Sequence, residues 1–571
     1  MPNLNVDSIK ERTFDAIVIG SGISGGWAAK ELTERGINTL MLERGRDVKH
    51  PVDYPTTNMY PWEFAHRGEV PYEIREANPV VARCYAFKED AMHFFVKDTE
   101  HPYVQEKPFD WIRGYQVGGK SLLWARQTQR WSDADFEGPA RDGFAVDWPI
   151  RYADLSPWYS HVEKFAGIAG NRDGIAHLPD GEFLPAWPLN SVENYFKGVV
   201  SRKYPGRHVI SARCAHLSKP EAIHLQQGRA QCQQRVLCQR GCPFGGYFSS
   251  NSSTIPWALK TGKLTLRPHS VVQEVIYDDQ KGRVTGVRVM DAQTKQVMEF
   301  YAKVIFINAA ALNTNLIMLN SRSGRFPNGL GNDSGVLGKY VAFHNYRATV
   351  AAEYDGFPDL MTDGRNPAGG GYMPRFRNVH RQETDFLRGY ASGFGAWRRL
   401  ETKRSGVGAS LKDNLLGPEL GNWKVHSHMM GETIPKETNT VSLDPDKKDA
   451  WGMPLLRINI DYDDNDEKMV KDYMEQLSEM FSAAGFKNIR GEDSHKAPGL
   501  DIHEMGGARM GKDPRSSMLN KWNQLHACNN VFVTDGACMT STSTQNPSLT
   551  YMALTARAVD HAVSEMKKGN I

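Results

Sequence analysis

The chain has 571 residues, of which 40% are hydrophobic, so it is long and apolar enough to bury a large core. We expect two intimately connected domains. The 69 Lys and Arg residues nearly balance the 66 Asp and Glu residues, and no basic run stands out. The sequence therefore predicts no nucleic-acid partner.

The amino-terminal segment, MPNLNVDSIKERTF, contains no apolar stretch long enough for a signal peptide. No later segment offers the roughly 18 uninterrupted apolar residues that a membrane-spanning helix needs. We therefore expect neither an export signal on this chain nor a direct membrane span.

Residues 14–43 follow the order of an apolar strand, a glycine turn, an amphipathic helix and a second apolar strand. The turn carries the GxGxxG pattern, and an acidic residue ends the second strand about 20 residues later, where it can accept hydrogen bonds from ribose hydroxyls. This order predicts a site for either FAD or NAD. The alternative is an ordinary βαβ unit with a solvated carboxylate. The predicted cofactor-binding residues are Gly20, Gly22, Ser24, Gly25, Glu43 and Arg44.

The rest of the chain is patterned less evenly. Residues 47–110 are rich in Pro, aromatic and charged residues with little periodicity, which predicts an irregular excursion or lid. Residues 264–310 contain several β-rich segments and lead into ALNTNLIML, a predicted helix, as in the second half of a nucleotide-binding sheet. Residues 346–500 alternate predicted strands with glycine-rich loops, and we assign them to a substrate-covering region.

Four of the seven cysteines fall within residues 214–242, which is unlike a disulfide framework of a small secreted domain. Cys232, Cys238 and Cys242 are clustered, and Pro243 directly follows the last of them. Three such thiols suit an iron–sulfur cluster of the 3Fe-4S type, whereas zinc usually takes four ligands. Unligated or disulfide-bonded thiols and another metal remain alternatives. Cys214 is a candidate fourth ligand, but it lies far from the other three in the sequence.

Three further blocks carry a family resemblance: VGGKSLLWAR at 117–126, HEMGGARMG at 503–511, and the ending NNVFVTDGACMTSTSTQNPSLTYMALTARAVDHA. Together with the amino-terminal βαβ unit, and in this order, they resemble the glucose-methanol-choline (GMC) oxidoreductase family over the whole chain. The resemblance implies FAD as cofactor and the oxidation of alcohols to carbonyls. It also implies a mixed α/β (α+β) fold, in which a Rossmann-type FAD-binding domain is interleaved with a substrate domain built on an antiparallel sheet with helices.

On this basis the sequence divides into discontinuous regions. We expect the FAD-binding domain to comprise residues 1–46, 111–130, 250–345 and 500–571. The lid comprises residues 47–110. The substrate domain comprises residues 131–249 and 346–499, with the cysteine loop at 228–246.

The resemblance also assigns roles to individual residues. Gly118, Gly119 and Ser121 would run along the flavin and pyrophosphate, Val272 would meet the adenine through its backbone, Asp535 would lie near the ribityl chain, and the role of Trp124 is open. His503 matches the catalytic histidine, whose neutral imidazole suits removal of the hydroxyl proton. Asn546 matches the partner that holds the substrate oxygen, since an amide cannot act as a base.

Each of these two residues has a structural alternative. Asn546 precedes Pro547 and a helical pattern, which is typical of a helix N-cap with proline at the first helical position. A helix starting at Pro547 would also point its positive end at the flavin and could stabilise the anionic reduced ring. His503 could be a hydrogen-bonded core histidine. His344 and His428 have no comparable support as site residues.

The cysteine segment is similar to the corresponding one in bacterial flavin-dependent sugar dehydrogenases, especially glucoside 3-dehydrogenase catalytic subunits. That similarity implies a glucoside-type substrate oxidised at C3, and a cluster that relays electrons to a c-type cytochrome. It further implies a small subunit with an export signal, and hence a periplasmic location by co-export; otherwise the chain would be cytoplasmic. The alternatives are an oxidase using oxygen, another sugar or polyol dehydrogenase such as one acting on gluconate, a lyase and a non-enzymatic FAD-stabilised scaffold.

Overall fold

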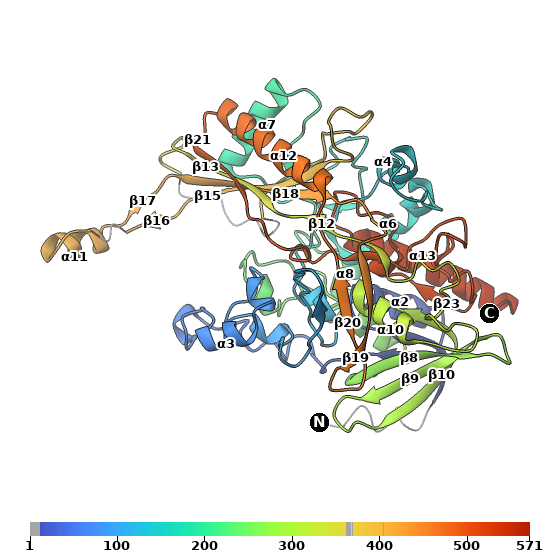
Figure 1. The fold of residues 1–571 in the computed structure, drawn as a ribbon. Helices are drawn as coiled ribbons and strands as arrows, with labels where there is room; N and C mark the ends of the chain where they lie inside the picture. Colours follow the sequence, from blue (N-terminus) through green and yellow to red (C-terminus); the bar gives the residue numbers. More distant parts are fainter. Residues whose placement is uncertain (1–11, 361–366, 368, 403–404) are drawn as a thin grey trace.

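The computed structural model describes residues 12–360, 367, 369–402 and 405–571. Residues 1–11, which make up most of the segment predicted to lack a signal peptide, lie outside these ranges, as do parts of two glycine-rich loops. Figure 1 shows two large sheets at opposite ends of the view, with helices packed on both. The prediction of a mixed α/β fold is confirmed.

The first sheet contains the predicted βαβ unit, formed by β1 (Thr13–Ile19), α2 (Ile23–Glu34) and β2 (Thr39–Leu42). Its parallel strands follow the order β7, β2, β1, β10 and β23, which is that of a Rossmann-type fold. The other two strands, β8 and β9, extend it as an antiparallel meander from β10. All seven strands fall within the ranges assigned to the FAD-binding domain. The remaining bounds are β7 (Leu264–Arg267), β8 (Ser270–Asp278), β9 (Arg283–Asp291), β10 (Val297–Ile307) and β23 (Val531–Val533).

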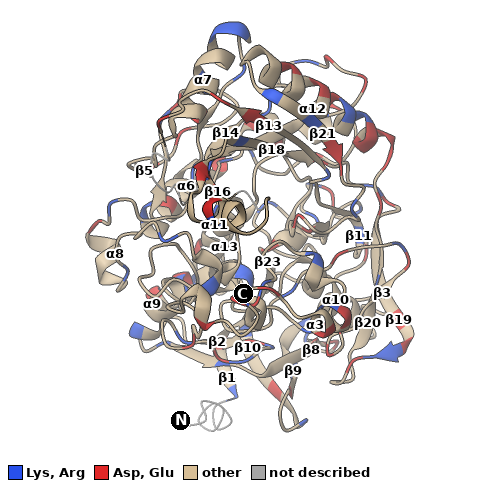
Figure 2. Cartoon of the chain, turned by 90° about the vertical axis from the view of Figure 1, so that its left-hand side faces the viewer, with Lys and Arg blue, Asp and Glu red and all other residues tan. Residues whose placement is uncertain are grey.

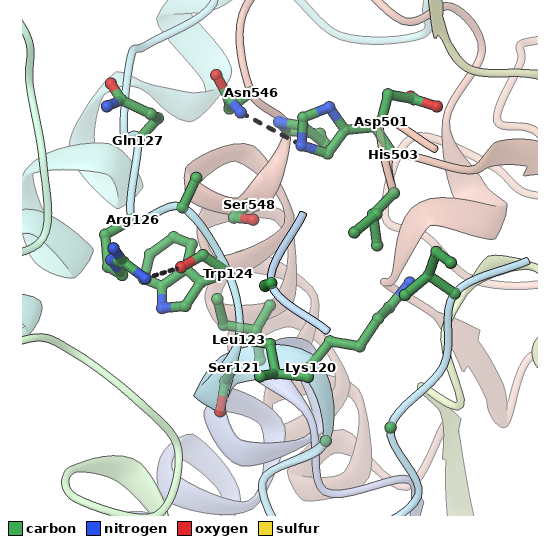
Figure 3. A pocket seen from close by; sticks show the side chains of 18 of the residues that line it. Lys120, Ser121, Leu123, Trp124, Arg126, Gln127, Asp501, His503, Asn546 and Ser548 are labelled. Atoms are coloured by element: carbon green, nitrogen blue, oxygen red, sulfur yellow. Dashed lines mark hydrogen bonds between the residues drawn. The ribbon is translucent and has the colours of Figure 1, made fainter. Parts of the chain in front are cut away.

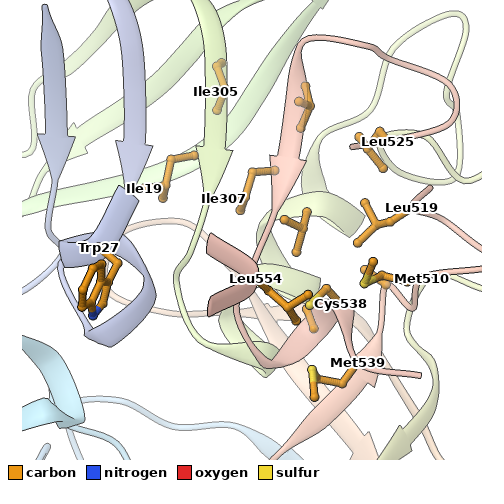
Figure 4. Close-up of a cluster of buried hydrophobic side chains, with 14 of the residues drawn as sticks. Ile19, Trp27, Ile305, Ile307, Met510, Leu519, Leu525, Cys538, Met539 and Leu554 are labelled. Carbon is orange, nitrogen blue, oxygen red and sulfur yellow. The ribbon is translucent and has the colours of Figure 1, made fainter. Parts of the chain in front are cut away.

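Apolar residues alternate toward the two faces of this sheet, and helices cover both. On one face, Ile19, Ile305 and Ile307 pack in one buried cluster with Leu554 of α13 (Ser548–Lys568) (Figure 4). On the other face, Val18, Val304 and Phe306 pack against Ala28 and Val559. Burial on both faces is what fixes the parallel strands in register and holds the strand ends, where the glycine turn lies, in place.

The second sheet is antiparallel throughout the described residues, with the order β21, β13, β18, β15, β14 and β6, and with β12 also pairing with β18. Helices α7 (Ser191–Lys203) and α12 (Asp464–Ala483) pack on one of its faces (Figure 1). All of its strands except β12 fall within the ranges assigned to the substrate domain. Their bounds are β6 (Ile210–Ser211), β12 (His344–Asn345), β13 (Ala348–Tyr354), β14 (Gly371–Met373), β15 (Tyr390–Trp397), β18 (Trp423–Glu432) and β21 (Lys487–Asp493).

Shorter elements connect the two sheets. Residues 47–110 contain only α3 (Tyr72–Ala77), β3 (Val104–Gln105) and single 3₁₀ turns. Basic and acidic residues are interspersed along the ribbon in Figure 2. Among the described residues, no helix is both long and apolar enough to span a membrane. The other helices are α4 (Asp133–Phe136), α5 (Gly138–Arg141), α6 (Tyr152–Ala166), α8 (Ala222–Gln226), α9 (Thr254–Lys260), α10 (Ala311–Asn320) and α11 (Ala409–Leu416). The other strands are β4 (Ile168–Ala169), β5 (Phe183–Leu184), β11 (Lys339–Ala342), β16 (Leu400–Glu401), β17 (Glu419–Leu420), β19 (Thr440–Lys448), β20 (Pro454–Asn459) and β22 (Met505–Gly507).

Candidate active site

A cavity of about 940 Å³ lies between the carboxyl ends of the parallel strands and the second sheet. Its size and its place at the strand ends are those of a cofactor and substrate site in an open α/β sheet. Most of the predicted site residues line it: Gly20, Gly22, Ser24, Glu43, Arg44, Gly119, Ser121, Val272, Asp535, His503 and Asn546. Gly25 and Gly118 lie behind its wall, and the three clustered cysteines lie in a neighbouring loop, from which Gln234 and Val236 reach the cavity.

The glycine turn brings backbone to the edge of this cavity. Gly20 has φ +95°, and a Cβ there would lie 2.3 Å from the Asn308 carbonyl oxygen. A Cβ at Gly25 would lie 1.9 Å from the Gly20 carbonyl oxygen, so this glycine allows α2 to approach the strand. At Gly22 a Cβ would meet no atom within 4 Å. The amino end of α2 thus opens onto free space, where its unpaired N–H groups can bind a pyrophosphate.

Glu43 is held where a dinucleotide needs a partner for its ribose, besides the site for its pyrophosphate. Its carboxylate is buried and accepts hydrogen bonds from the backbone N–H and the hydroxyl of Ser21, at 3.1 and 2.5 Å, and from the N–H of Gly45 at 2.9 Å. Burial raises the pKa of this carboxyl, and the hydrogen bonds oppose that effect. The next residue, Arg44, pairs with Asp449 at 2.7 Å. The fixed carboxylate therefore faces the cavity in the place expected for a ribose partner.

We expect Glu43→Gln to weaken FAD binding by about 10-fold, because a hydrogen bond to a charged acceptor is stronger by about 1 kcal/mol than one to a neutral amide. The affinity can be measured by fluorescence titration of the flavin-free protein. The exposed residue Glu492 offers a control, Glu492→Gln. An unchanged affinity in Glu43→Gln would remove Glu43 from the cofactor site.

The second glycine segment packs directly on the first. Gly118 donates its N–H to the Ser21 hydroxyl at 2.9 Å, and a Cβ at Gly119 would lie 3.3 Å from Gly22 Cα. Ser121 donates its hydroxyl to the Gly118 carbonyl at 2.6 Å. These contacts bring two segments that are far apart in the sequence into one glycine-lined wall, beside which a flat ring system can lie.

Asp535 closes the opposite side of the cavity. Its two carboxylate oxygens accept hydrogen bonds from the Thr314 hydroxyl at 2.6 Å and the Ala537 N–H at 2.9 Å. Burial raises its pKa to about 6. Ser548, the first residue of α13, also lines the cavity, so the positive end of that helix faces the space in which a cofactor ring would lie.

His503 and Asn546 point toward one another at the cavity wall (Figure 3). The distance between His503 Nε2 and Asn546 Nδ2 is 3.2 Å. Burial lowers the pKa of His503 well below its ordinary value, so the ring is neutral at neutral pH and able to accept a proton. The alternative in which Asn546 only caps a helix is wrong, because α13 begins at Ser548, Pro547 is its N-cap residue, and no side chain caps it.

Several residues of this site are not predicted by the sequence pattern. His344, which it set aside, is buried, and its Nδ1 lies 2.9 Å from His503 Nδ1. Asp501 lies beside both rings, with one carboxylate oxygen within 4.8 Å of a nitrogen of each. Lys120 pairs with Glu504 at 3.1 Å at the cavity wall. These residues do not follow the regular sequence spacing of a helix face or a strand face. The only signal in the sequence is that Asp501 lies two residues before His503, which could have indicated a role for Asp501.

The far half of the cavity is lined by the second sheet. Its polar side chains are His426 and His428 on β18, Tyr346 after β12 and Tyr372 on β14. A Cβ at Gly393 would lie 2.1 Å from the His428 ring, so this glycine makes room for the imidazole. This half offers hydrogen-bonding groups at some distance from His503, which suits a substrate with several hydroxyls.

The cysteine loop adjoins the cavity, because its residues Gln234 and Val236 line it. Trp124 and Arg126, neighbours in Figure 3, line the same cavity. Cys232, Cys238 and Cys242 are all free thiols with partial exposure. Cys238 Sγ lies 3.7 Å from the Nε2 atom of His216, and Gly246 donates its N–H to Cys242 Sγ at 3.3 Å. Burial raises the pKa of Cys232 to about 11, with Cys238 and Cys242 near enough to contribute. The three thiols are thus near enough to interact electrostatically, but their sulfur atoms do not all lie within 4.8 Å of one another.

Two buried arginines flank these thiols. Arg126 opposes the burial effect on the pKa of Cys238, and Cys242 is the main charged neighbour of Arg229. Each has one guanidinium nitrogen that is buried without a hydrogen-bond partner. The hydrogen bonds that Arg126 and Arg229 donate go to carbonyl or amide oxygens, and among the described residues neither forms an ion pair with a carboxylate. Cys214, fully buried, packs in a cluster with Cys232.

Comparison with known proteins agrees with this geometry. A sequence model of the GMC oxidoreductase family matches residues 14–345, and its carboxyl-terminal counterpart matches residues 435–555. The chain is 28% identical to 2-methyl-1,2-propanediol dehydrogenase of Mycolicibacterium austroafricanum, over 96% of this chain and 94% of that protein. It is 27% identical to the fructose dehydrogenase large subunit of Gluconobacter japonicus, over 97% and 98% of the two chains. Gluconate 2-dehydrogenase flavoprotein of Pantoea cypripedii is 26% identical, over 95% and 92%.

Among solved structures, pyridoxine 4-oxidase from Mesorbium loti superposes with a TM-score of 0.58 at 14% identity, covering 96% of this chain and 99% of that one, which shows a shared fold. Members of the GMC family bind FAD, and the residues present here fit it. The glycine turn leaves open space at the amino end of α2, Glu43 is fixed as a ribose partner, and His503 faces the region that the two glycine segments leave free. Because the two matches together cover most of the chain, including the glycine turn, the first sheet and the segments of His503 and Asn546, this chain belongs to the GMC oxidoreductase family.

Proposed function

We propose that the protein is an FAD-dependent dehydrogenase that oxidises a secondary sugar hydroxyl to a ketone, at C3 of a glucoside-type pyranose. The observation that carries the proposal is the His503–Asn546 pair at the wall of the cofactor cavity, with its nitrogens 3.2 Å apart. Three similar proteins named above act, by their names, on alcohols, sugars or sugar acids. The choice of a glucoside and of C3 rests on the resemblance of the cysteine segment.

The residues divide the chemistry between them. FAD, when bound, supplies the oxidant that takes hydride from the carbinol carbon. His503 Nε2 accepts the hydroxyl proton, because burial keeps the ring neutral. Asn546 donates an N–H to the same oxygen and holds it beside His503. The polar groups on the second sheet, His426, His428 and Tyr346, hold the remaining hydroxyls and orient the ring.

We extend the proposal to a 3Fe-4S cluster held by Cys232, Cys238 and Cys242. A thiolate-bound cluster carries negative charge, and the two buried arginines beside the thiols, Arg126 and Arg229, have no carboxylate partner among the described residues. Burying an unpaired charge is costly, so an anionic group between these cations would compensate it. When bound, such a cluster supplies a one-electron relay. This charge balance supports the proposal over unligated thiols.

A one-electron relay further favours a dehydrogenase over an oxidase. The electron acceptor would be a c-type cytochrome, and a small subunit with an export signal would carry the folded chain to the periplasm. Both follow from the similarity of the cysteine segment to bacterial sugar dehydrogenases and form part of the proposal.

Product analysis tests the proposed reaction. The holoenzyme is incubated with methyl glucosides of both anomers, with gluconate and with a simple diol, in the presence of a redox dye, and products are identified by NMR. A 3-keto glycoside is the expected product. If gluconate alone were oxidised, the protein would be a sugar-acid dehydrogenase instead. Turnover in which oxygen serves as acceptor without the dye would identify an oxidase.

The pH dependence follows from the depressed pKa of His503. Because only the neutral ring can accept the proton, we expect kcat/KM to stay level as the pH falls from about 8, and to decline only below the ordinary histidine value of about 6.5. Asp501, whose pKa burial raises to about 7, is the other titrating neighbour, and Asp501→Asn removes its contribution. A decline that sets in above pH 7 in Asp501→Asn would contradict a base that is neutral at neutral pH.

A further inference from the structure

His344 is buried on β12, and both nitrogens of its ring have partners. Its Nε2 lies 3.1 Å from the Thr542 carbonyl oxygen and 3.0 Å from the Ser543 carbonyl oxygen. Its Nδ1 lies 2.9 Å from Nδ1 of His503, and the two rings are nearly perpendicular, with an interplanar angle of 87°. These contacts determine which ring nitrogen of His344 and of His503 carries a proton.

Carbonyl oxygens can only accept hydrogen bonds, so Nε2 of His344 must carry a proton and donate it. Burial lowers the pKa of His344 to about 4, so the ring is neutral and holds only that one proton. Its Nδ1 is therefore an acceptor. The 2.9 Å contact then requires Nδ1 of His503 to donate, which leaves Nε2 of His503 unprotonated, with a lone pair that accepts from Asn546 Nδ2.

We propose that His344 is a positioning residue that fixes His503 in the tautomer with its proton on Nδ1, so that the basic Nε2 faces Asn546 and the substrate hydroxyl. The inference deepens the proposed function and rests on it for the reaction. As the alcohol is oxidised, its O–H bond breaks and the proton goes to Nε2 of His503. The hydride goes to FAD, the oxidant of that reaction, and His344 keeps its own proton throughout.

The backbone holds His344 firmly in this place. Its N–H donates to Asp501 Oδ2 at 2.8 Å, and β12 pairs with β18, where His344 is opposite Glu432. Thr542 and Ser543 lie shortly before Asn546, so one loop supplies both the acceptors for His344 and the partner of His503. A displacement of His344 would therefore move both sides of the catalytic pair. In contrast, among the described residues His428 forms no hydrogen bond with His503 or Asn546.

Three variants separate the orienting role from a packing role. In His344→Asn the amide oxygen can take the place of Nδ1 and accept from His503, whereas in His344→Gln the amide is one bond longer and reaches toward the carbonyls in the place of Nε2. In His344→Leu both functions are lost. We expect kcat to fall on the order of 10- to 100-fold in the Gln and Leu variants and by less than about 10-fold in the Asn variant, with KM and FAD content near wild type.

A second measurement does not depend on the variants or on the substrate. Nitrogen-15 NMR of the resting holoenzyme, with labelled histidine and His503→Gln for assignment, reports the tautomer directly. A proton on Nδ1 of His503 is expected. A proton on Nε2, or equal kcat in His344→Gln and wild type, would overturn the proposal. Equal losses in the Asn and Gln variants with FAD retained would also overturn it. Failure of the wild type to oxidise glucosides would overturn only the proposed function.

Discussion

Replacing His503 by alanine is expected to lower kcat on the order of 1,000-fold while the protein retains its FAD. The ring is neutral because burial lowers its pKa, and its Nε2 lies 3.2 Å from Asn546 Nδ2, the group proposed to hold the substrate oxygen. Asn546 cannot replace it, since an amide is not a base at neutral pH. The measurement is the rate of flavin reduction in stopped-flow mixing with substrate, together with the flavin absorbance of the purified variant.

Two controls make this result specific. The exposed residue His208 offers His208→Ala, which should leave the reduction rate unchanged. Asn546→Ala should lower the rate by less than His503→Ala, because it removes only a hydrogen bond to the substrate oxygen, of about 1–3 kcal/mol. If His503→Ala kept more than a tenth of the wild-type rate, His503 would not be the base.

Replacing Cys238 by serine is expected to separate the two halves of the reaction. Reduction of the flavin by substrate should proceed within about 2-fold of the wild-type rate, because the thiol lies in a loop outside the His503–Asn546 pair. Steady-state transfer to a cytochrome should fall on the order of 100-fold, since a missing thiolate ligand disrupts the cluster that relays single electrons.

The chain offers a matched control for this variant in Cys528, which is buried and far from the loop in the sequence. Cys528→Ala should keep both half-reactions. Iron analysis and electron paramagnetic resonance should find a cluster in this control and none in Cys238→Ser. Absence of iron in the wild-type protein purified without oxygen would contradict the cluster, and it would leave the charge of Arg126 and Arg229 unexplained.

The cofactor half of the fold could be predicted from the sequence because its rules are local. A tight turn requires glycine at a position with φ +95°, as at Gly20, and close packing of helix on strand requires one at Gly25. The buried parallel strands are continuous apolar runs, which a single sequence displays plainly. The roles of His503 and Asn546 came from the family resemblance, and the structure brings the two side chains together.

The rest of the site depends on tertiary contacts that no local pattern records. His344 is an isolated histidine on a two-residue strand, and only the fold brings it to His503, 159 residues later in the chain. The capping pattern at Asn546 and Pro547 offered an alternative to the predicted site role, but the Asn546 side chain contacts His503 and the helix begins one residue later. The hydrogen bond in the site therefore outweighs the local preference for capping.

The account depends above all on FAD lying beside the His503–Asn546 pair with a sugar hydroxyl between them. Anaerobic addition of methyl glucoside to the yellow holoenzyme tests this most directly. We predict stoichiometric bleaching of the flavin absorbance, which a redox dye restores and air restores only slowly. A colourless protein that takes up no flavin, or a flavin that no alcohol bleaches, would contradict the account.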